Sequence, residues 1–271
     1  MRKTGFDPRR KRLRRILRLA ALLAPLLGVK ITPKLYGALA KLFWFYAPAK
    51  NILKANFKRA GISASPELIS ETVRNFGRYL SEFFSVLGKS ESLSFLRGEV
   101  DIDSLKKTHE SGRGAFALSP HFGNWEVGAL ILGEEFGGIS VIIRTTGDKW
   151  LDERIKICRG RNRLFDVSKG VRPILRALEE KAIVAAAVDE PRSKGVEVKF
   201  MGANIFFPSA IFRMAEETDS ALIPVRCKRS HEGKITVKSY EEVRTPQELA
   251  DIFEEWIREE PTQWMLMESL E

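Results

Sequence analysis

The chain has 271 residues, of which 44% are hydrophobic and 30% are charged, with a formal net charge of +10. This composition supports a large buried core and excludes a chain that is disordered over most of its length. Two cysteines, Cys158 and Cys227, provide neither a disulfide framework nor a CxxC metal site, so we expect them to be small apolar core residues.

The positive charge is concentrated at the N-terminus. Residues 1–59 contain 16 lysines and arginines and one acidic residue, whereas the remainder contains 29 basic and 34 acidic residues. A basic run at 9–15 leads into an apolar stretch at 16–29, and a second amphipathic stretch at 35–46 ends in four aromatic residues. The boundary of this part falls near residues 61–66, so we predict an N-terminal segment 1–60 and a second domain 61–271.

Three functions compete for the N-terminal segment. The apolar run at 19–29 is shorter than the roughly 20 residues of a spanning helix, so a span requires a tilted helix or a thinned bilayer. No convincing small-residue cleavage site follows Val29, which argues against a signal peptide. Arginines next to leucine and alanine favour an anionic membrane surface over a nucleic acid. We therefore predict a helical membrane-associating segment.

Strands and helices alternate after residue 65. The periodicity predicts a helix at 66–87, and candidate strands at 114–119, 139–144, 183–189 and 221–226. Candidate helices lie at 124–135, 150–158, 171–180 and 209–217, a hairpin joins 197–200 to 205–207, and a late strand covers 234–240. This order predicts an α/β fold with a mixed, largely parallel central sheet and helices on both faces.

The segment 119–126 contains a histidine and a glutamate five positions apart. His121 falls in a turn between a buried strand and a helix, and Asn124 is the expected N-cap of that helix. Glu126 then lies in the first helical turn, from which its carboxylate can reach the imidazole. Histidine is suited to general-base work near neutral pH, and ligands of open α/β sheets bind where strands give way to helices.

Further polar residues fall at the expected carboxyl ends of strands. Arg144 follows one strand and Asp189 with Glu190 follows another, while Arg159, Arg161 and Arg163 form a cluster suited to binding phosphate or carboxylate. The chain contains no GxSxG, GxGxxG, P-loop, HExxH or CxxC pattern, so serine hydrolysis, nucleotide binding and zinc chemistry lack support.

Four segments resemble the lysophospholipid acyltransferase superfamily, and within it the lipid A biosynthesis acyltransferase branch. They are the H-x4-E segment 121–126, the arginine block from Arg144 to Arg163, the segment 187–209 with Asp189, and the P-x-Q-W segment 261–264. The similarity spans roughly residues 50 to 264 in consistent order. The tail at 265–271 lacks the aromatic and basic ending typical of lipid A enzymes, so a related glycolipid acceptor remains open.

The resemblance implies an O-acyltransferase. His121 would remove the proton from an acceptor hydroxyl as it attacks an acyl thioester, and Glu126 would hold the imidazole. Substrate-binding candidates are Arg144, Arg159, Arg161, Arg163, Asp189 and Asn124, with the choice among the three clustered arginines open. The acyl donor would be acyl carrier protein or coenzyme A, and no metal or cofactor is needed.

The expected location is the cytoplasmic face of the bacterial inner membrane. Two alternatives stay open: a noncatalytic lipid-binding protein at the membrane surface, and an acyltransferase that acts on a lysophospholipid or another glycolipid.

Overall fold

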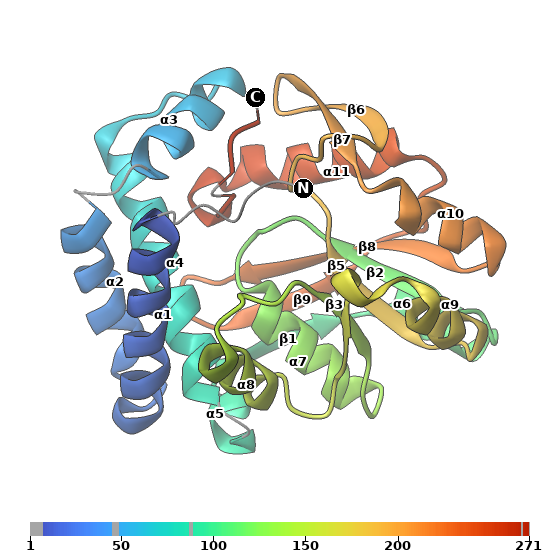
Figure 1. Ribbon diagram of the computed structural model, residues 1–271, viewed down its shortest axis with the longest axis horizontal. Helices are drawn as coiled ribbons and strands as arrows, with labels where there is room; N and C mark the ends of the chain where they lie inside the picture. The colour runs from blue at the N-terminus through green and yellow to red at the C-terminus, as the bar shows by residue number, and fades with distance from the viewer. Residues whose placement is uncertain (1–7, 45–48, 87–88, 267, 271) are drawn as a thin grey trace.

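The computed structural model describes residues 8–44, 49–86, 89–266 and 268–270 (Figure 1). Of the basic run at 9–15, only the side chain of Arg15 is described, and the side chains of the aromatic run at 43–46 lie outside the described residues.

A seven-stranded sheet forms the centre of the molecule. Its strands are β1 (Arg97–Asp101), β2 (Ala115–Ser119), β3 (Ser140–Ile143), β4 (Arg163–Asp166), β5 (Ile183–Ala187), β8 (Ala221–Arg229) and β9 (Ile235–Ser239). The order across the sheet is β1-β9-β8-β2-β5-β3-β4, and every neighbouring pair is parallel except β8 with β9. A separate antiparallel hairpin joins β6 (Val196–Phe200) to β7 (Ala203–Phe207). The prediction of a mixed, largely parallel sheet is therefore confirmed.

Helices lie on both faces of this sheet and at one of its ends. The α-helices of the described residues are α1 (Pro8–Leu27), α2 (Thr32–Trp44), α3 (Ala49–Arg59), α4 (Pro66–Val86), α5 (Ser90–Leu96), α6 (Asp103–Glu110), α7 (Trp125–Glu135), α8 (Lys149–Cys158), α9 (Arg172–Glu179), α10 (Ser209–Glu217) and α11 (Pro246–Glu259). Figure 1 shows α7 and α8 below the sheet, and α11 with the β6–β7 hairpin above it.

Each face of the sheet has its own core. Alternate residues of β2 divide between them, with Phe116 and Leu118 facing α9, α10 and α11, and Ala117 facing α7. Strand β2 is buried along its whole length because β5 and β8 pair with it on either side. The carboxyl end of β2 therefore opens in the middle of the sheet, where α/β proteins bind their ligands.

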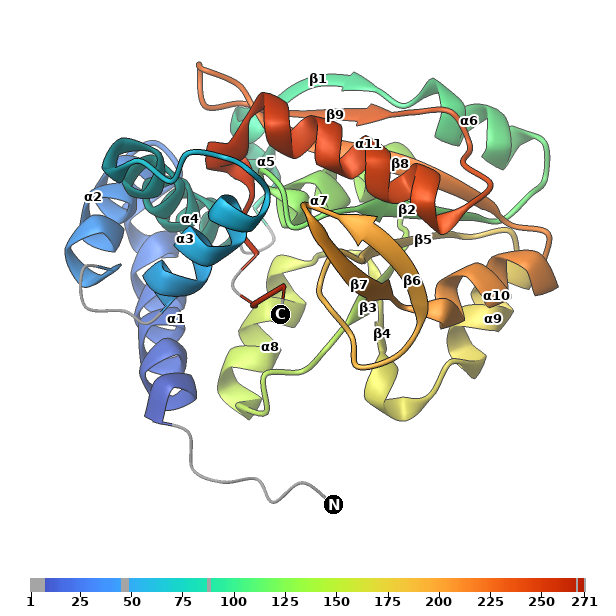
Figure 2. The same cartoon turned by 90° about the horizontal axis from the view of Figure 1, so that it is seen from above.

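The N-terminal helices gather at one end of the molecule, and α9 and α10 lie at the other (Figures 1 and 2). Leu53 and Phe57 of α3 are buried in the core that α9 to α11 share with the sheet, while α1 and α2 contact α4. Helices α1 and α2 nevertheless leave large apolar side chains in solvent, namely Leu19, Leu22, Leu23, Leu26, Leu27, Leu35 and Leu39, with Ile31 between the two helices. Among the described residues, no helix has the length and apolar character needed to cross a membrane.

Five of the α-helices and strands after residue 60 were not predicted from the sequence: α5, β1, α6, β4 and α11. Helix α11 carries a signal that could have found it, because Thr245 and Glu248 form a capping box at its start. Strand β4 is only four residues long and has a charged residue at each end, so it shows no apolar pattern long enough to predict a strand. The position of β4 matters for the site. In a parallel sheet the first residue of a strand lies on the side opposite to the carboxyl ends, where the site is expected.

Candidate active site

His121 lies in the turn that joins β2 to α7. The turn ends at Asn124, whose side-chain oxygen accepts a hydrogen bond from the backbone N–H of Val127 and so caps α7, as the sequence predicts. Gly123 has a φ of +61°, and a Cβ at this position would lie 1.8 Å from the carbonyl oxygen of Cys227. Only glycine fits here, because a side chain would collide with the backbone of β8.

The imidazole of His121 contacts Asp189, which follows β5. Its Nδ1 lies 2.6 Å from Oδ1 of Asp189, and the backbone N–H of His121 donates to the same oxygen at 3.0 Å. The other carboxylate oxygen accepts from the indole Nε1 of Trp264 at 3.0 Å. Asp189 is fully buried, and a buried carboxylate needs such donors because it has lost its water.

This contact fixes the protonation state that His121 presents to the cavity. An ionised carboxylate only accepts hydrogen bonds, so Nδ1 carries the proton and donates it to Asp189. No hydrogen bond to Nε2 is formed within the described part of the chain, which leaves that nitrogen able to accept a proton. The ring keeps 28% of its side-chain surface exposed, and Trp125 meets its edge with the ring centroids 4.9 Å apart.

The surroundings set the pKa of His121. Burial alone lowers the pKa, since it penalises the charged imidazolium. The charge and the hydrogen bond of Asp189 outweigh burial, and the charges of Glu190 and Glu126 add to them, so the pKa of His121 is raised above its ordinary value. The structure thus stabilises the imidazolium that a general base forms when it takes a proton.

Glu126 does not hold the imidazole in the way the sequence predicts. Its carboxylate forms a bidentate ion pair with Arg159, with Oε2 accepting from Nε at 2.9 Å and Oε1 from Nη2 at 2.5 Å. Arg159 caps the end of α8 and keeps only 13% of its side-chain surface exposed, so the guanidinium requires a carboxylate partner. The position next to the imidazole is occupied instead by Trp125, one residue earlier on α7.

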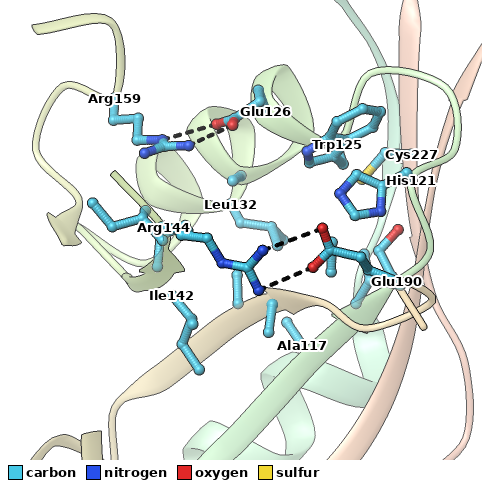
Figure 3. A pocket seen from close by; sticks show the side chains of 18 of the residues that line it. Ala117, His121, Trp125, Glu126, Leu132, Ile142, Arg144, Arg159, Glu190 and Cys227 are labelled. Carbon is cyan, nitrogen blue, oxygen red and sulfur yellow. Dashed lines mark hydrogen bonds and ion pairs between the residues drawn. The ribbon is translucent and has the colours of Figure 1, made fainter. Parts of the chain in front are cut away.

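A second acidic group lies at the rim. Glu190 accepts from Arg144 at 3.2 Å and from Arg192 at 2.8 Å, and Figure 3 shows the Arg144 pair beside His121. Burial raises the pKa of Glu190 to about 7, with a further rise from the hydrogen bond and charge of Glu268, while the Arg144 charge acts in the opposite direction. Arg144 keeps 52% of its side-chain surface exposed and so remains accessible to an anionic ligand.

These residues surround a cavity of about 310 Å³ between the sheet and α7. Polar groups line part of it, among them His121, Glu126, Arg144, Arg159 and Glu190 (Figure 3). Apolar and mostly small side chains line the rest, namely Ala117, Ala129, Leu132, Val141, Ala185, Ala186 and Val225. A slot of this kind accommodates an aliphatic chain.

Cys227 also lines the cavity, but its thiol is buried and burial raises its pKa to about 12. The neutral thiol is a poor nucleophile. Neither Cys227 nor the buried Cys158 belongs to a metal-ligand cluster, and no group of three or more metal-ligating side chains occurs among the described residues.

Four of the predicted site residues do not line this cavity in the described structure. One of them, Asp189, contacts the imidazole of His121 without lining the cavity itself. Arg163 begins β4 at the opposite edge of the sheet and pairs with Glu180 at 3.4 Å, and Arg161 is exposed just before it. Asn124 is completely buried and donates to Glu82 at 2.8 Å. The sequence had placed the arginine cluster at one edge because β4 was not recognised; only Arg159 of that cluster reaches the cavity.

Trp264, Trp125 and Arg192 are site residues that the sequence did not single out. The P-x-Q-W segment gave a signal for Trp264 but not its partner, because Asp189 lies 75 positions away in the chain. Trp125 and Arg192 stand next to residues that were recognised, and nothing in their spacing identified them.

Comparison with known proteins identifies the family of the chain. The sequence pattern of the family described as bacterial lipid A biosynthesis acyltransferase matches residues 4–270 of the chain. The chain is 26% identical over 217 residues to the phosphatidylinositol mannoside acyltransferase of Mycolicibacterium smegmatis, a match that covers 74% of this chain and 71% of that protein. It is 24% identical over 218 residues to the protein of the same description from Mycobacterium tuberculosis, covering 74% and 69% of the two chains. The chain therefore belongs to the bacterial lipid A biosynthesis acyltransferase family and is an acyltransferase of the lipid A and glycolipid type.

Proposed function

We propose that this protein transfers a fatty acyl group from an acyl thioester to a hydroxyl of a lipid A precursor or a related glycolipid, with His121 as the general base. The observation that carries the proposal is the contact between His121 Nδ1 and Asp189 at 2.6 Å, which leaves Nε2 available at a cavity whose wall is partly apolar. A base, its orienting carboxylate and a slot for an acyl chain meet at one place.

The reaction proceeds by proton transfer and acyl exchange. Nε2 of His121 takes the proton of the acceptor hydroxyl while the oxygen attacks the thioester carbonyl carbon. The tetrahedral intermediate then expels the thiolate, which receives the proton from the imidazolium. Asp189 stabilises the imidazolium between the two steps, and base catalysis of this kind contributes about 10² to 10⁴ in rate.

Glu126 acts on this reaction in two ways. Its charge raises the pKa of His121 across space, and its bidentate contact holds Arg159 at the cavity wall. Arg159 has its charge balanced there, whereas the more exposed Arg144 is suited to a phosphate or carboxylate of the substrate. Asp189 is an orienting residue in this mechanism, since its oxygens are occupied by His121 and Trp264.

The acyl chain of the donor enters the apolar slot. The walls made by Ala117, Ala129 and Ala185 leave room because these residues are small. The acidic surface of acyl carrier protein and the phosphates of coenzyme A both suit the basic groups at the cavity mouth, and a direct comparison of the two thioesters decides which is the donor.

The exposed apolar side chains of the N-terminal helices support binding to an anionic membrane surface. Leu22 and Leu26 of α1 are 50% and 80% exposed, and the exposed Arg15 lies on the same helix. Apolar side chains for the acyl boundary combined with basic residues for anionic headgroups are typical of interfacial helices. We infer that the cytoplasmic face of the bacterial inner membrane is where the enzyme meets its water-insoluble acceptor.

The test compares membrane lipids from cells that contain wild-type protein, His121→Ala or no protein. Mass spectrometry should show one acylated species that is lost in the last two, and its mass names the acyl chain and the acceptor. His231→Ala is the matched control, because His231 is exposed in the turn before β9. A His121→Ala enzyme with near-normal turnover would refute the mechanism, and a folded protein that binds vesicles without forming product would indicate a noncatalytic lipid-binding role.

A further inference from the structure

The backbone of the turn at 121–124 is held by residues from three distant segments. The carbonyl of His121 accepts from the backbone N–H of Met265 at 2.8 Å. The N–H of Gly123 donates to the carbonyl of Gln263 at 2.9 Å, and the N–H of Asn124 donates to the carbonyl of Cys227 at 3.1 Å. With the bond from the His121 N–H to Asp189, every one of these contacts comes from outside the turn.

Gln263 connects two of these supports. Its side-chain oxygen accepts from the backbone N–H of Arg229 at 2.8 Å, and its side-chain nitrogen donates to the carbonyl of Arg229 at 3.0 Å. The amide thus pairs with the backbone of β8 as a neighbouring strand would, two residues beyond Cys227. Gln263 is only 5% exposed, so solvent cannot replace these bonds.

A buried ion pair connects Arg229 to the last residue of the turn. Arg229 donates to Glu82 of α4, and the two side chains are 6% and 2% exposed. The other carboxylate oxygen of Glu82 accepts from the side-chain nitrogen of Asn124 at 2.8 Å. The chain of contacts therefore runs from Gln263 through Arg229 and Glu82 to Asn124, which ends the catalytic turn.

The turn is packed too tightly to stay in place when a neighbouring segment moves. Gly123 lies directly against the carbonyl of Cys227, and Phe122 is completely buried. A displacement of β8 or of the segment 263–265 is transmitted to the turn because these backbones touch it.

We propose that Gln263 is a positioning residue for acyl transfer, which acts through Arg229 and the turn 121–124 to hold the imidazole of His121 at Asp189. The proposal rests on the proposed role of His121 as the base. Gln263 does not line the cavity, so its effect falls on the rate of the chemical step and not on substrate binding.

The test is Gln263→Met, which keeps the length of the side chain and removes both hydrogen bonds to Arg229. The expected result is a loss in kcat of about 10- to 100-fold, the effect of misplacing a catalytic group slightly, with KM for donor and acceptor unchanged. Nitrogen-15 NMR of the imidazoles reads the geometry directly, and the chain has only three histidines to assign. We expect the signal of the Nδ1 proton of His121 to weaken or shift in Gln263→Met.

Two controls separate positioning from general loss of stability. Gln247 makes the same pair of amide bonds with the backbone of Lys199, and neither residue bonds to the turn or lines the cavity, so Gln247→Met should leave kcat and the His121 signal unchanged. Ile174→Val removes one buried methyl group in the core and reports what destabilisation alone does. If Gln263→Met does not fold, Gln263→Glu takes its place with the same expected loss, because a carboxylate cannot donate to the Arg229 carbonyl.

A folded Gln263→Met or Gln263→Glu enzyme that retains kcat, or whose imidazole signal matches that of Ile174→Val, would overturn the proposal. The NMR result is independent of turnover, so it distinguishes failure of this proposal from failure of the proposed function. If His121→Ala proves active while Gln263→Met still shifts the Nδ1 signal, the positioning contact stands and the role of the base falls.

Discussion

Asp189 binds the imidazole of His121 at 2.6 Å although the two residues are 68 positions apart in the chain. The contact joins the ends of β2 and β5, which are neighbours in the sheet, so the parallel pairing of these strands brings the imidazole and its carboxylate partner together. His121 belongs to a local sequence motif, whereas Asp189 becomes its partner because β2 and β5 are neighbouring strands.

Replacing Asp189 tests this pairing. We expect Asp189→Asn to lower kcat by about 10² to 10⁴, because the amide neither stabilises the imidazolium nor enforces the Nδ1–H tautomer. Steady-state kinetics with a defined thioester measures the loss. Asp219→Asn, at a 91% exposed side chain, is the matched control and should retain full activity. Equal rates for both variants would exclude Asp189 from the mechanism.

The raised pKa of His121 predicts the pH dependence of turnover. The base must be neutral to act, so kcat/KM should fall as the pH drops through the folded pKa, which lies above 6.5. Since Asp189 raises the pKa of His121, the acid limb of the profile should move to lower pH in Asp189→Asn. The sign for stability is opposite to that for activity: the contribution of this contact is complete below pH 6.5 and is lost as the pH rises through the folded pKa. A profile of kcat/KM between pH 5 and 9 checks the first prediction, and an acid limb unmoved by the substitution would contradict it.

The ion pair between Glu126 and Arg159 predicts an asymmetric effect on stability. Both side chains are at most 13% exposed, so removing one partner leaves a poorly solvated charge and should lower the free energy of unfolding by about 3 to 5 kcal/mol. Arg159→Met combined with Glu126→Gln should lose less than the sum of the single variants. Denaturant unfolding of the four proteins measures this coupling, and strict additivity would show that the pair is not coupled.

The alanine walls of the cavity predict how acyl length can be changed. Ala129 of α7 lines the slot, and Ala129→Leu fills part of it. The preferred acyl chain should become shorter, while transfer of the shortest thioesters should change little. Competition among thioesters of graded length, read by mass spectrometry of the product, measures this shift. An unchanged length preference in the folded variant would place the acyl chain elsewhere.

The exposed leucines of α1 predict membrane binding. Leu22→Gln with Leu26→Gln should weaken partition onto anionic vesicles by at least about tenfold, since burying a leucine contributes about 1.5 to 3 kcal/mol. Vesicle flotation measures the partition, and activity on a detergent-dispersed acceptor should be retained. Ile157→Gln, at a residue of α8 that is 48% exposed, is the control for loss of an apolar surface group outside α1 and α2. Equal binding by both proteins would exclude this helix as the contact.

Local patterns in the sequence predict most of the elements that flank the site. The buried run before His121, the cap at Asn124 and the hairpin after Asp189 all depend on neighbouring residues, so propensity and spacing suffice for them. The bounds of β2 and α7 differ from the expected ones by a single residue at one end.

The pairing of side chains depends on contacts between distant segments, and spacing does not determine it. Glu126 was expected at the imidazole because both residues belong to one motif, yet the buried guanidinium of Arg159 requires its carboxylate. The role of Asp189 depends on which strands are neighbours, which no single segment encodes. Arg163 was expected near the carboxyl ends of the strands because β4 was not recognised. Arg163 is the first residue of β4 and therefore lies at the amino end of that strand.

The contacts of Gln263, Trp264 and Met265 also determine when the enzyme can become active during synthesis. These residues lie near the C-terminal end of the described chain, and each bonds to the catalytic turn or to the residues that hold it. A nascent chain that has already folded β2, β5 and α7 still lacks the support of its base while this segment is inside the ribosome. Acyl transfer is therefore expected only after residues 263–265 have left the ribosome and bound the turn, so shorter nascent chains would not consume the donor.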